Sequence, residues 1–217
     1  MNDAKRLYTE LAAAYVRGVL PGAASHLKDE ELLEVGRAAG LKLHRFKRTI
    51  QLPRVRAVLG VLRAIVPATL LDIGSGRGVF LWPLLDAFPE LPVTAVEPDA
   101  QRRAHLEAVR RGGIDRLRVL PANAQQLACA DGAFDVVTVL EVLEHQVHPM
   151  PLAREAIRVA RRFVVVSVPS TPDDNPEHLQ LFTGATLPQL LTEAGAANVR
   201  VDYVLNHIIA VARVDRR

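Results

Sequence analysis

The chain has 217 residues, of which 49% are hydrophobic, and a net charge of +3 from 27 Lys and Arg against 24 Asp and Glu. That composition excludes a disordered chain, and the length is sufficient for one sizeable core. A single cysteine, Cys129, excludes an internal disulfide. No apolar run reaches the roughly 18 residues that a membrane span needs, and residues 1–6 lack a secretory apolar region. We therefore expect a cytoplasmic protein with no membrane contact.

The first 66 residues predict a helical extension. Asp29 is positioned to N-cap a helix that Gly40 ends, and Pro53 suits the first turn of another. The dipeptide Pro21-Gly22 breaks the helical spacing that precedes it. Helices are thus expected over 4–18, 30–39 and 53–65.

Positive charge is concentrated in this extension. Between Val35 and Leu71 there are eight basic residues and no acidic one. Two interpretations are open: a solvated helical face, or a platform for an anionic substrate such as RNA, a nucleotide or an acidic lipid head group. The basic residues are Arg37, Lys42, Arg45, Lys47, Arg48, Arg54, Arg56 and Arg63.

From Ala68 onward the pattern alternates strand and helix, which predicts an α/β fold with a parallel sheet. The last two strands are joined by about two residues, Leu205-Asn206, which is too short for a parallel crossover. The final strand must therefore run antiparallel. Strands are expected near 68–73, 92–97, 116–121, 134–139, 162–168, 198–204 and 207–214, and helices near 78–88, 100–111, 150–160 and 185–194.

The segment between the first of these strands and the helix after it carries the clearest functional signal. Gly74, Gly76 and Gly78 follow the apolar strand, and Asp72 precedes them. Glycine lets the backbone adopt positive φ and lets a ligand approach closely. The G-x-G-x-G spacing differs from the G-x-G-x-x-G of dinucleotide sites. A carboxylate at Asp72 would repel a pyrophosphate but suits a cationic ligand.

This turn, together with Glu97 at the end of the next strand, resembles the first motif and its acidic partner in class I S-adenosylmethionine (SAM) methyltransferases. The resemblance extends over about 70–214. It implies a Rossmann-like seven-stranded sheet of order 3-2-1-4-5-7-6. It also divides the chain into a helical cap, 1–66, and a SAM-binding domain, 67–217.

The resemblance also implies a set of cofactor contacts. Asp72 would take the ammonium of SAM, backbone N–H groups of the glycine turn its carboxylate, and Glu97 the two ribose hydroxyls. Asn123 stands where the family often has an aspartate for the adenine amino group. The full set is Asp72, Gly74, Ser75, Gly76, Gly78, Glu97, Pro98, Asn123, Ala124 and Leu140.

A polar cluster, Glu141-x-x-Glu144-His145, follows the fourth predicted strand. With His178 it resembles the metal site of small-RNA 3′-terminal 2′-O-methyltransferases. The same phrases occur in ubiquinone-pathway and other small-molecule O-methyltransferases, where the histidine acts without a metal. We expect Glu141, Glu144 and His145 to be catalytic, without a metal ion. A divalent ion held by these residues and His178 is the alternative.

The predicted function is SAM-dependent methyl transfer to a small-molecule or anionic acceptor, at oxygen. The alternatives are an RNA ribose 2′-O-methyltransferase with a metal site and a SAM-binding protein without catalysis. Three further residues are expected to be structural. Trp82 should pack in the core, Asp99 should N-cap the helix over 100–111, and Asp135 should bond backbone near its strand start.

Overall fold

The structure, a computed structural model, describes residues 7–23, 26–121, 123–172 and 174–216. Seven strands form one sheet of order β3-β2-β1-β4-β5-β7-β6, as predicted. β7 pairs antiparallel with both β5 and β6, whereas the other pairs are parallel. The strands are β1 (Leu70–Ile73), β2 (Val93–Val96), β3 (Leu117–Leu120), β4 (Phe134–Leu140), β5 (Ala160–Pro169), β6 (Asn198–Val204) and β7 (His207–Arg213).

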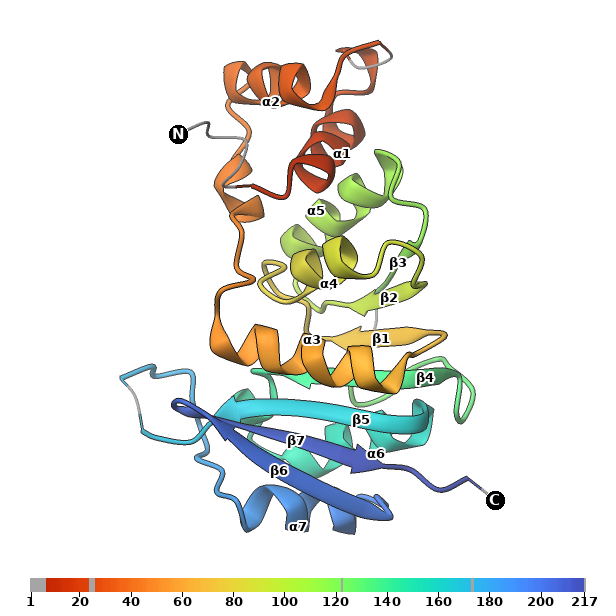
Figure 1. Cartoon of the computed structure of the whole chain (residues 1–217), viewed down its shortest axis with the longest axis vertical. Coiled ribbons are helices and arrows are strands. Elements are labelled where there is room, and N and C mark those ends of the chain that lie inside the picture. The colour runs from red at the N-terminus through yellow and green to blue at the C-terminus, as the bar shows by residue number, and fades with distance from the viewer. Residues whose placement is uncertain (1–6, 24–25, 122, 173, 217) are drawn as a thin grey trace.

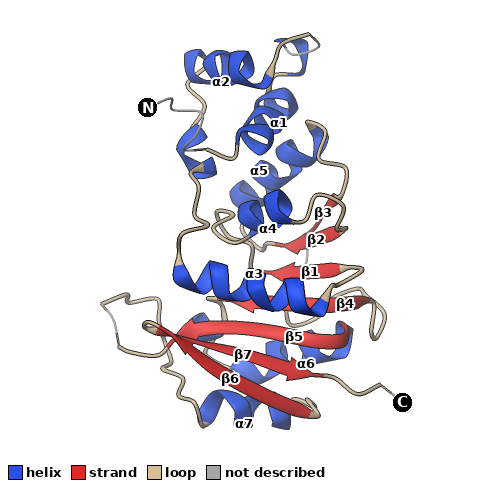
Figure 2. Cartoon of the chain, viewed as in Figure 1, coloured by secondary structure: helices blue, strands red, loops and turns tan. Residues whose placement is uncertain are grey.

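Helices cover both faces of the sheet (Figure 2). Apolar residues of α3, α4 and α5 form one core with one face, and those of α6 and α7 form a second core with the other. α1 and α2 lie beyond α5, at one end of the molecule (Figure 1). The helices are α1 (Thr9–Val19), α2 (Asp29–Ala38), α3 (Pro53–Ile65), α4 (Leu81–Ala87), α5 (Ala100–Arg111), α6 (Pro149–Val159) and α7 (Thr186–Glu193), with short 3-10 turns η2 (Pro21–Ala23), η3 (Leu43–Phe46) and η4 (Leu143–His145).

The N-terminal extension is packed tightly onto the rest of the molecule. A Cβ added to Gly18 would collide with the carbonyl of Ala108, and one added to Gly112 would collide with the carbonyl of Ala14. The absent side chains therefore let α1 and α5 approach backbone to backbone. Apolar residues of the extension belong to the same core cluster as those of α4 and α5. A division of the chain at residue 66 stays a prediction.

Two details of the extension differ from the sequence prediction. The first helix begins at Thr9, because Leu7 forms an isolated bridge with Lys47; residues 4–6 of the predicted helix lie outside the described ones. The second helix already includes Asp29, so Asp29 is not its N-cap. The N-cap is Lys28, whose N–H donates to Glu31 Oε2 at 2.7 Å.

The helix after the glycine turn also starts later than expected. α4 begins at Leu81 rather than near residue 78, since Gly78 has φ +83°, which is not a helical value. Two structural predictions are confirmed. Asp99 Oδ1 accepts from the N–H of Arg102 at 2.7 Å as the N-cap of α5, and Asp135 Oδ2 accepts from the N–H of Ala68 at 2.7 Å. Among the described residues, no helix has the length and apolarity to cross a membrane.

Candidate functional site

The glycine turn after β1 adopts a conformation that requires its glycines. Gly74, Gly76 and Gly78 have φ of +77°, +56° and +83°, values that other residues rarely adopt. A Cβ at Gly78 would collide with the ring of Trp82. Trp82 is 3% exposed, and its Nε1 donates to the carbonyls of Arg45 and Arg77, so it is a core residue as predicted.

Asp72, the last residue but one of β1, carries a buried carboxylate with one uncommitted oxygen. Its Oδ1 accepts from Thr138 Oγ1 at 2.7 Å, whereas no described residue bonds its Oδ2. Burial raises the pKa of Asp72 to about 6, because desolvation disfavours the charged form, and the charge of Glu97 adds to this. A cationic group placed against Oδ2 would restore the stability of the ionised form.

Glu97 follows β2 and is 2% exposed. Its Oε2 accepts from the N–H of Gly76 at 2.7 Å, and its Oε1 accepts from the N–H of Asp99 at 3.0 Å. Both oxygens are thus fixed in direction, and each keeps a second acceptor site. The contact between this carboxylate and the ribose hydroxyls of SAM stays a prediction.

Four backbone N–H groups of the glycine turn donate to acceptors within the protein. The N–H groups of Gly74 and Ser75 donate to the carbonyl of Val96, that of Gly78 donates to the carbonyl of Ser75, and that of Gly76 donates to Glu97. The contact between the N–H groups of this turn and the carboxylate of SAM stays a prediction. The same turn carries one positive charge, that of the exposed Arg77.

Two cavities meet at this turn. The first, the Asp72 cavity, has a volume of about 190 Å³ and the second, the Asn123 cavity, about 440 Å³. Gly74 lines both. Of the predicted contacts, Asp72, Gly74, Ser75, Gly76 and Leu140 line the first cavity, and Pro98, Asn123 and Ala124 line the second.

Three of the predicted cofactor contacts, Gly78, Glu97 and Asn123, make contacts within the protein. Gly78 and Glu97 line neither cavity. Gly78 packs on Trp82, and Glu97 accepts a hydrogen bond from the N–H of Gly76. Asn123 Oδ1 accepts from the N–H of Gln125 at 3.0 Å. Asn123 thus closes a local turn with the oxygen that was expected to face an adenine amino group.

Glu141 follows β4 in a left-handed conformation with φ +57°. Such a conformation costs a non-glycine residue on the order of 1–3 kcal/mol. Its Oε1 accepts from Ser167 Oγ at 2.6 Å, its Oε2 accepts from His207 Nε2 at 3.1 Å, and Arg54 Nε lies 3.8 Å from Oε2. No spacing in the sequence indicates Ser167 or His207 as partners of Glu141. The contacts depend on the strand order, in which β5 lies beside β4 and β7 beside β5.

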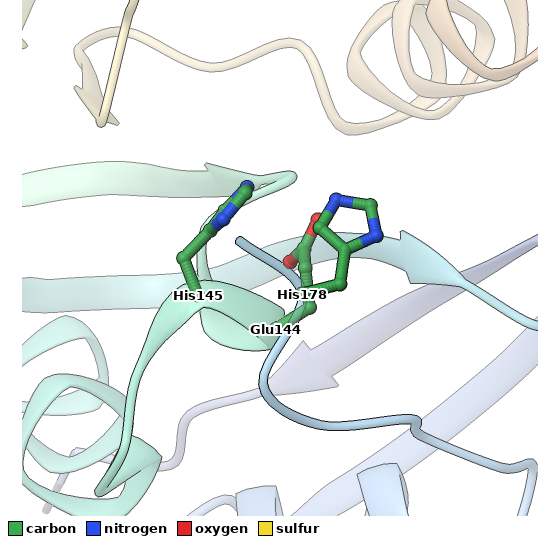
Figure 3. A group of neighbouring side chains, drawn as sticks. All are labelled: Glu144, His145 and His178. Atoms are coloured by element: carbon green, nitrogen blue, oxygen red, sulfur yellow. The ribbon is translucent and has the colours of Figure 1, made fainter. Parts of the chain in front are cut away.

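Glu144, His145 and His178 form a second polar group, here called the Glu-His-His group (Figure 3). One ligand atom from each lies within 4.8 Å of the others. His145 Nδ1 lies 2.9 Å from the carbonyl oxygen of Glu177. A carbonyl only accepts, so Nδ1 of His145 carries the hydrogen of this bond. Glu141 does not belong to this group, so the predicted quartet is a trio.

The basic residues of the extension divide between several places. Arg48 pairs with Asp86 at 3.0 Å and lies over the ring of Tyr8, and Arg37 pairs with Glu34 at 2.5 Å. Arg56 and Arg63 line a separate hollow beside α3. A third set forms what is here called the basic groove. Its charged and imidazole side chains are those of Lys42, His44, Arg45, Lys47, Arg77 and Arg102, with Asp99 the acid that lines it.

The basic groove adjoins the Asp72 cavity, because Arg77 and Val79 line both. Arg45 lines the groove and also donates to the ring of His105, which is not a lining residue. Burial, and then the charge of Arg45, lower the pKa of His105, which disfavours the charged form of this imidazole. The lysines and the arginines therefore supply the positive charge of the groove.

The sheet order, the glycine turn and the two fixed carboxylates define a class I SAM-dependent methyltransferase. The buried Asp72 with an uncommitted oxygen fits the ammonium of SAM, and a Cβ at Gly76 would meet no atom closer than 3.8 Å, which leaves space for a ligand. The chain belongs to the methyltransferase domain family, whose model matches residues 41–201.

Two curated relatives and two solved structures illustrate the similarity. The chain is 35% identical over 95 residues to a tRNA U34 carboxymethyltransferase of Cronobacter sakazakii, which is 43% of this chain and 29% of that protein. It is 44% identical over 78 residues to ribosomal RNA small subunit methyltransferase G of Sorangium cellulosum, 35% of this chain and 33% of that protein. The matches thus span about a third of each relative.

The solved structures share the fold at low sequence identity. A SAM-dependent methyltransferase from Aquifex aeolicus superposes with a TM-score of 0.64 and 20% identity, over 76% of this chain and 92% of that one. The cyclase SpnF superposes with a TM-score of 0.61 and 18% identity, over 75% of this chain and 81% of that one. Identities this low support the fold alone.

Proposed function

We propose that this methyltransferase acts on an anionic acceptor, and that the acceptor is RNA. The observation that carries the proposal is the basic groove, which adjoins the Asp72 cavity through Arg77 and Val79. A groove lined by several cations beside a reaction site favours a polyanion over a neutral small molecule, since each phosphate contact releases counterions. The names of the two curated relatives, which refer to tRNA and ribosomal RNA, support the same acceptor class.

For methyl transfer from SAM, the protein mainly has to position the acceptor and exclude water from the site. Bound SAM supplies a methyl group on a good leaving group, so the acceptor only needs to be held in line with it. An oxygen acceptor also needs a base to receive its proton. Glu141, Glu144 and His145 are the proposed catalytic residues, since they follow β4 at the carboxyl end of the parallel strands, beside the cofactor turn.

The test is a turnover screen with radiolabelled SAM. Unmodified RNA, mononucleotides, and small phenols and carboxylic acids serve as acceptors at low and high salt. We expect RNA to be methylated, with a KM that rises steeply with salt concentration because a polyanion binds through counterion release. Methylation of neutral phenols at a rate that salt does not change would contradict the proposal.

A matched pair of double variants sharpens this test. K42E/K47E reverses two charges in the basic groove, and R56E/R63E reverses two exposed charges beside α3, so the net charge of the protein is the same in both. We expect only the groove variant to raise the KM for RNA, and neither to change SAM affinity by more than about twofold. Equal effects of the two pairs would indicate that net charge acts rather than the groove.

A second candidate is a metal-dependent RNA ribose 2′-O-methyltransferase. The convergence of Glu144, His145 and His178 favours it, because two imidazoles and a carboxylate are ligands that divalent ions accept. A metal bound by the three would help to acidify a ribose hydroxyl. A chelator should then abolish turnover, one divalent ion should restore it, and His178→Ala should weaken metal binding.

The alternative without a metal predicts the opposite pattern. Turnover should survive the chelator, and His145→Ala should lower kcat without any change in metal content. SAM binding with no methyl transfer to any acceptor would instead support a non-catalytic SAM-binding protein, or a different reaction on the same fold, as the name of the cyclase SpnF illustrates.

A further inference from the structure

A charged network beside the Asp72 cavity is not needed to hold the cofactor. The carboxylate of Glu141 accepts from Ser167 Oγ at 2.6 Å and from His207 Nε2 at 3.1 Å, and Arg54 Nε lies 3.8 Å away. α3, β5 and β7, which are far apart in the sequence, thus converge on one carboxylate. Arg54, Glu141 and Ser167 line the Asp72 cavity.

The network fixes both the main chain and the side chain of Glu141. Its N–H donates to the carbonyl of Ser167 at 2.9 Å, in addition to the bond between the two side chains. Ser167 is 1% exposed, so this hydroxyl does not exchange freely with solvent. A left-handed backbone at a non-glycine residue persists only where its surroundings determine it. The carboxylate is therefore held in a single orientation at the wall of the cavity.

We propose that Glu141 is the catalytic base that receives the acceptor proton, and that Ser167 and His207 are its positioning residues. A lone pair of the acceptor oxygen forms the new bond to the methyl carbon. The bond between that carbon and the sulfonium breaks, and its electron pair stays on sulfur as the neutral thioether. The proton of the acceptor hydroxyl passes to the carboxylate of Glu141. The inference rests on the proposed transfer to oxygen.

Glu141 is better placed for this task than His145. Glu141 lines the same cavity as Asp72 and the glycine turn, whereas His145 is not among the residues that line it. One nitrogen of His145 is also committed to the carbonyl of Glu177. The proton-accepting group beside the cofactor turn is thus the carboxylate.

Several charged groups lie near Glu141, and their protonation must be separated from that of Glu141 in a kinetic test. Arg54 on α3 and His207 on β7 face it directly, and Asp72 on β1 and Arg77 line the same cavity. Protonation of Asp72 would weaken SAM binding and imitate the loss of a base. Rates must therefore be compared at saturating SAM, where kcat is independent of SAM affinity.

The first experiment is a kinetic comparison with the acceptor that the screen selects. Glu141→Gln should lower kcat by roughly 10²–10⁴-fold, the usual contribution of a general base. Ser167→Ala and His207→Leu should lower kcat by roughly 10–100-fold with little change in either KM, and Ser167→Thr, which keeps the hydroxyl, should recover most of the rate. Ser170→Ala and His148→Ala are the matched controls and should leave kcat unchanged.

Two kinetic results would overturn the proposal. One is a Glu141→Gln variant that keeps its kcat while it binds SAM normally. The other is a loss in Ser167→Ala that Ser167→Thr does not recover, or that falls entirely on KM. SAM affinity measured by calorimetry separates these results from a variant that fails to fold.

A second experiment needs no acceptor. Proton-detected ¹⁵N spectra report which nitrogen of His207 carries the hydrogen. A carboxylate only accepts, so Nε2 should carry it, and Glu141→Gln should shift that resonance whereas Ser170→Ala should not. An Nε2 without hydrogen, or one that Glu141→Gln leaves unchanged, contradicts the network. If no acceptor is methylated, the proposed function fails, and this experiment still decides whether the network exists.

Discussion

The two halves of the site are built in different ways. The proposed cofactor half comes from one short stretch of the chain. Asp72 in β1, Gly74 in the glycine turn and Glu97 directly after β2 lie within 26 residues. The proposed acceptor half comes from segments that are far apart in the sequence. The surroundings of Glu141 are contributed by α3, β5 and β7, which carry Arg54, Ser167 and His207.

This difference separates two kinds of physical information. A glycine turn with flanking acids is a local pattern, because its function depends on backbone angles and on neighbours along the chain. The acceptor half depends on which strands are adjacent in the sheet. His207 reaches Glu141 because β7 lies against β5, with His207 in register with Pro169. No spacing in the sequence expresses that contact.

The largest effect in the cofactor half is expected for Glu97→Ala. The carboxylate holds the N–H of Gly76, and it is the proposed partner of the ribose hydroxyls. Loss of hydrogen bonds to a charged group costs about 1.5–3 kcal/mol, so calorimetry should show SAM affinity lower by roughly 10–150-fold. The control is Glu107→Ala on α5, where the carboxylate pairs with Arg110. Equal SAM affinity for the two variants would exclude Glu97 from the cofactor contacts.

Prediction from sequence is most successful where the pattern is local. Helix α3 and the caps at Asp99 and Gly40 follow from proline, acid and glycine at fixed positions, and the reversed last strand follows from a short hairpin. The late start of α4 does not follow from the sequence, because apolar spacing does not reveal that Gly78 adopts positive φ.

The division of the polar residues that follow β4 between two groups of partners could not be predicted from the sequence. Glu141 and Glu144 are three residues apart, and the sequence suggests that they act together. The carboxylate of Glu141, whose backbone is left-handed, instead bonds Ser167 and His207, whereas Glu144 lies with His145 and His178. One sequence motif is thus divided between two groups of side chains.

The second-largest effect is expected for the dependence of SAM affinity on pH, through the protonation of Asp72. Its pKa is raised to about 6 by burial, and its ionised form is the proposed partner of the ammonium of SAM. Between pH 7 and pH 5 the ionised fraction of the free protein falls roughly tenfold, so SAM affinity should fall by up to that factor. An α-amino group stays protonated over this range. Asp72→Asn should bind SAM weakly at both pH values; a wild-type affinity that is constant between them would remove Asp72 from the ammonium contact.

The same carboxylate has a consequence for stability of the free protein. Its pKa is higher in the folded state, about 6, than the ordinary value of 3.8, so the folded state binds more protons between these values. The contribution of Asp72 to stability is therefore greatest below about pH 4 and is lost as pH rises through 6. Thermal unfolding without SAM should show that Asp72→Asn raises Tm at pH 7.5 more than at pH 4.

The smallest effect is expected for Asp99, two residues after Glu97. Asp99 is the N-cap of α5 through the N–H of Arg102, and its own N–H supports Glu97 through the main chain. Asp99→Ala should therefore lower the free energy of unfolding by about 1 kcal/mol and leave SAM affinity nearly unchanged, while Asp99→Asn keeps the cap and the stability. Because Asp99 is an acid that lines the basic groove, both variants should bind RNA slightly more tightly than the wild type. A large loss of SAM affinity in Asp99→Asn would mean that the cofactor half extends beyond Glu97, and that a residue predicted to be structural contacts the ligand.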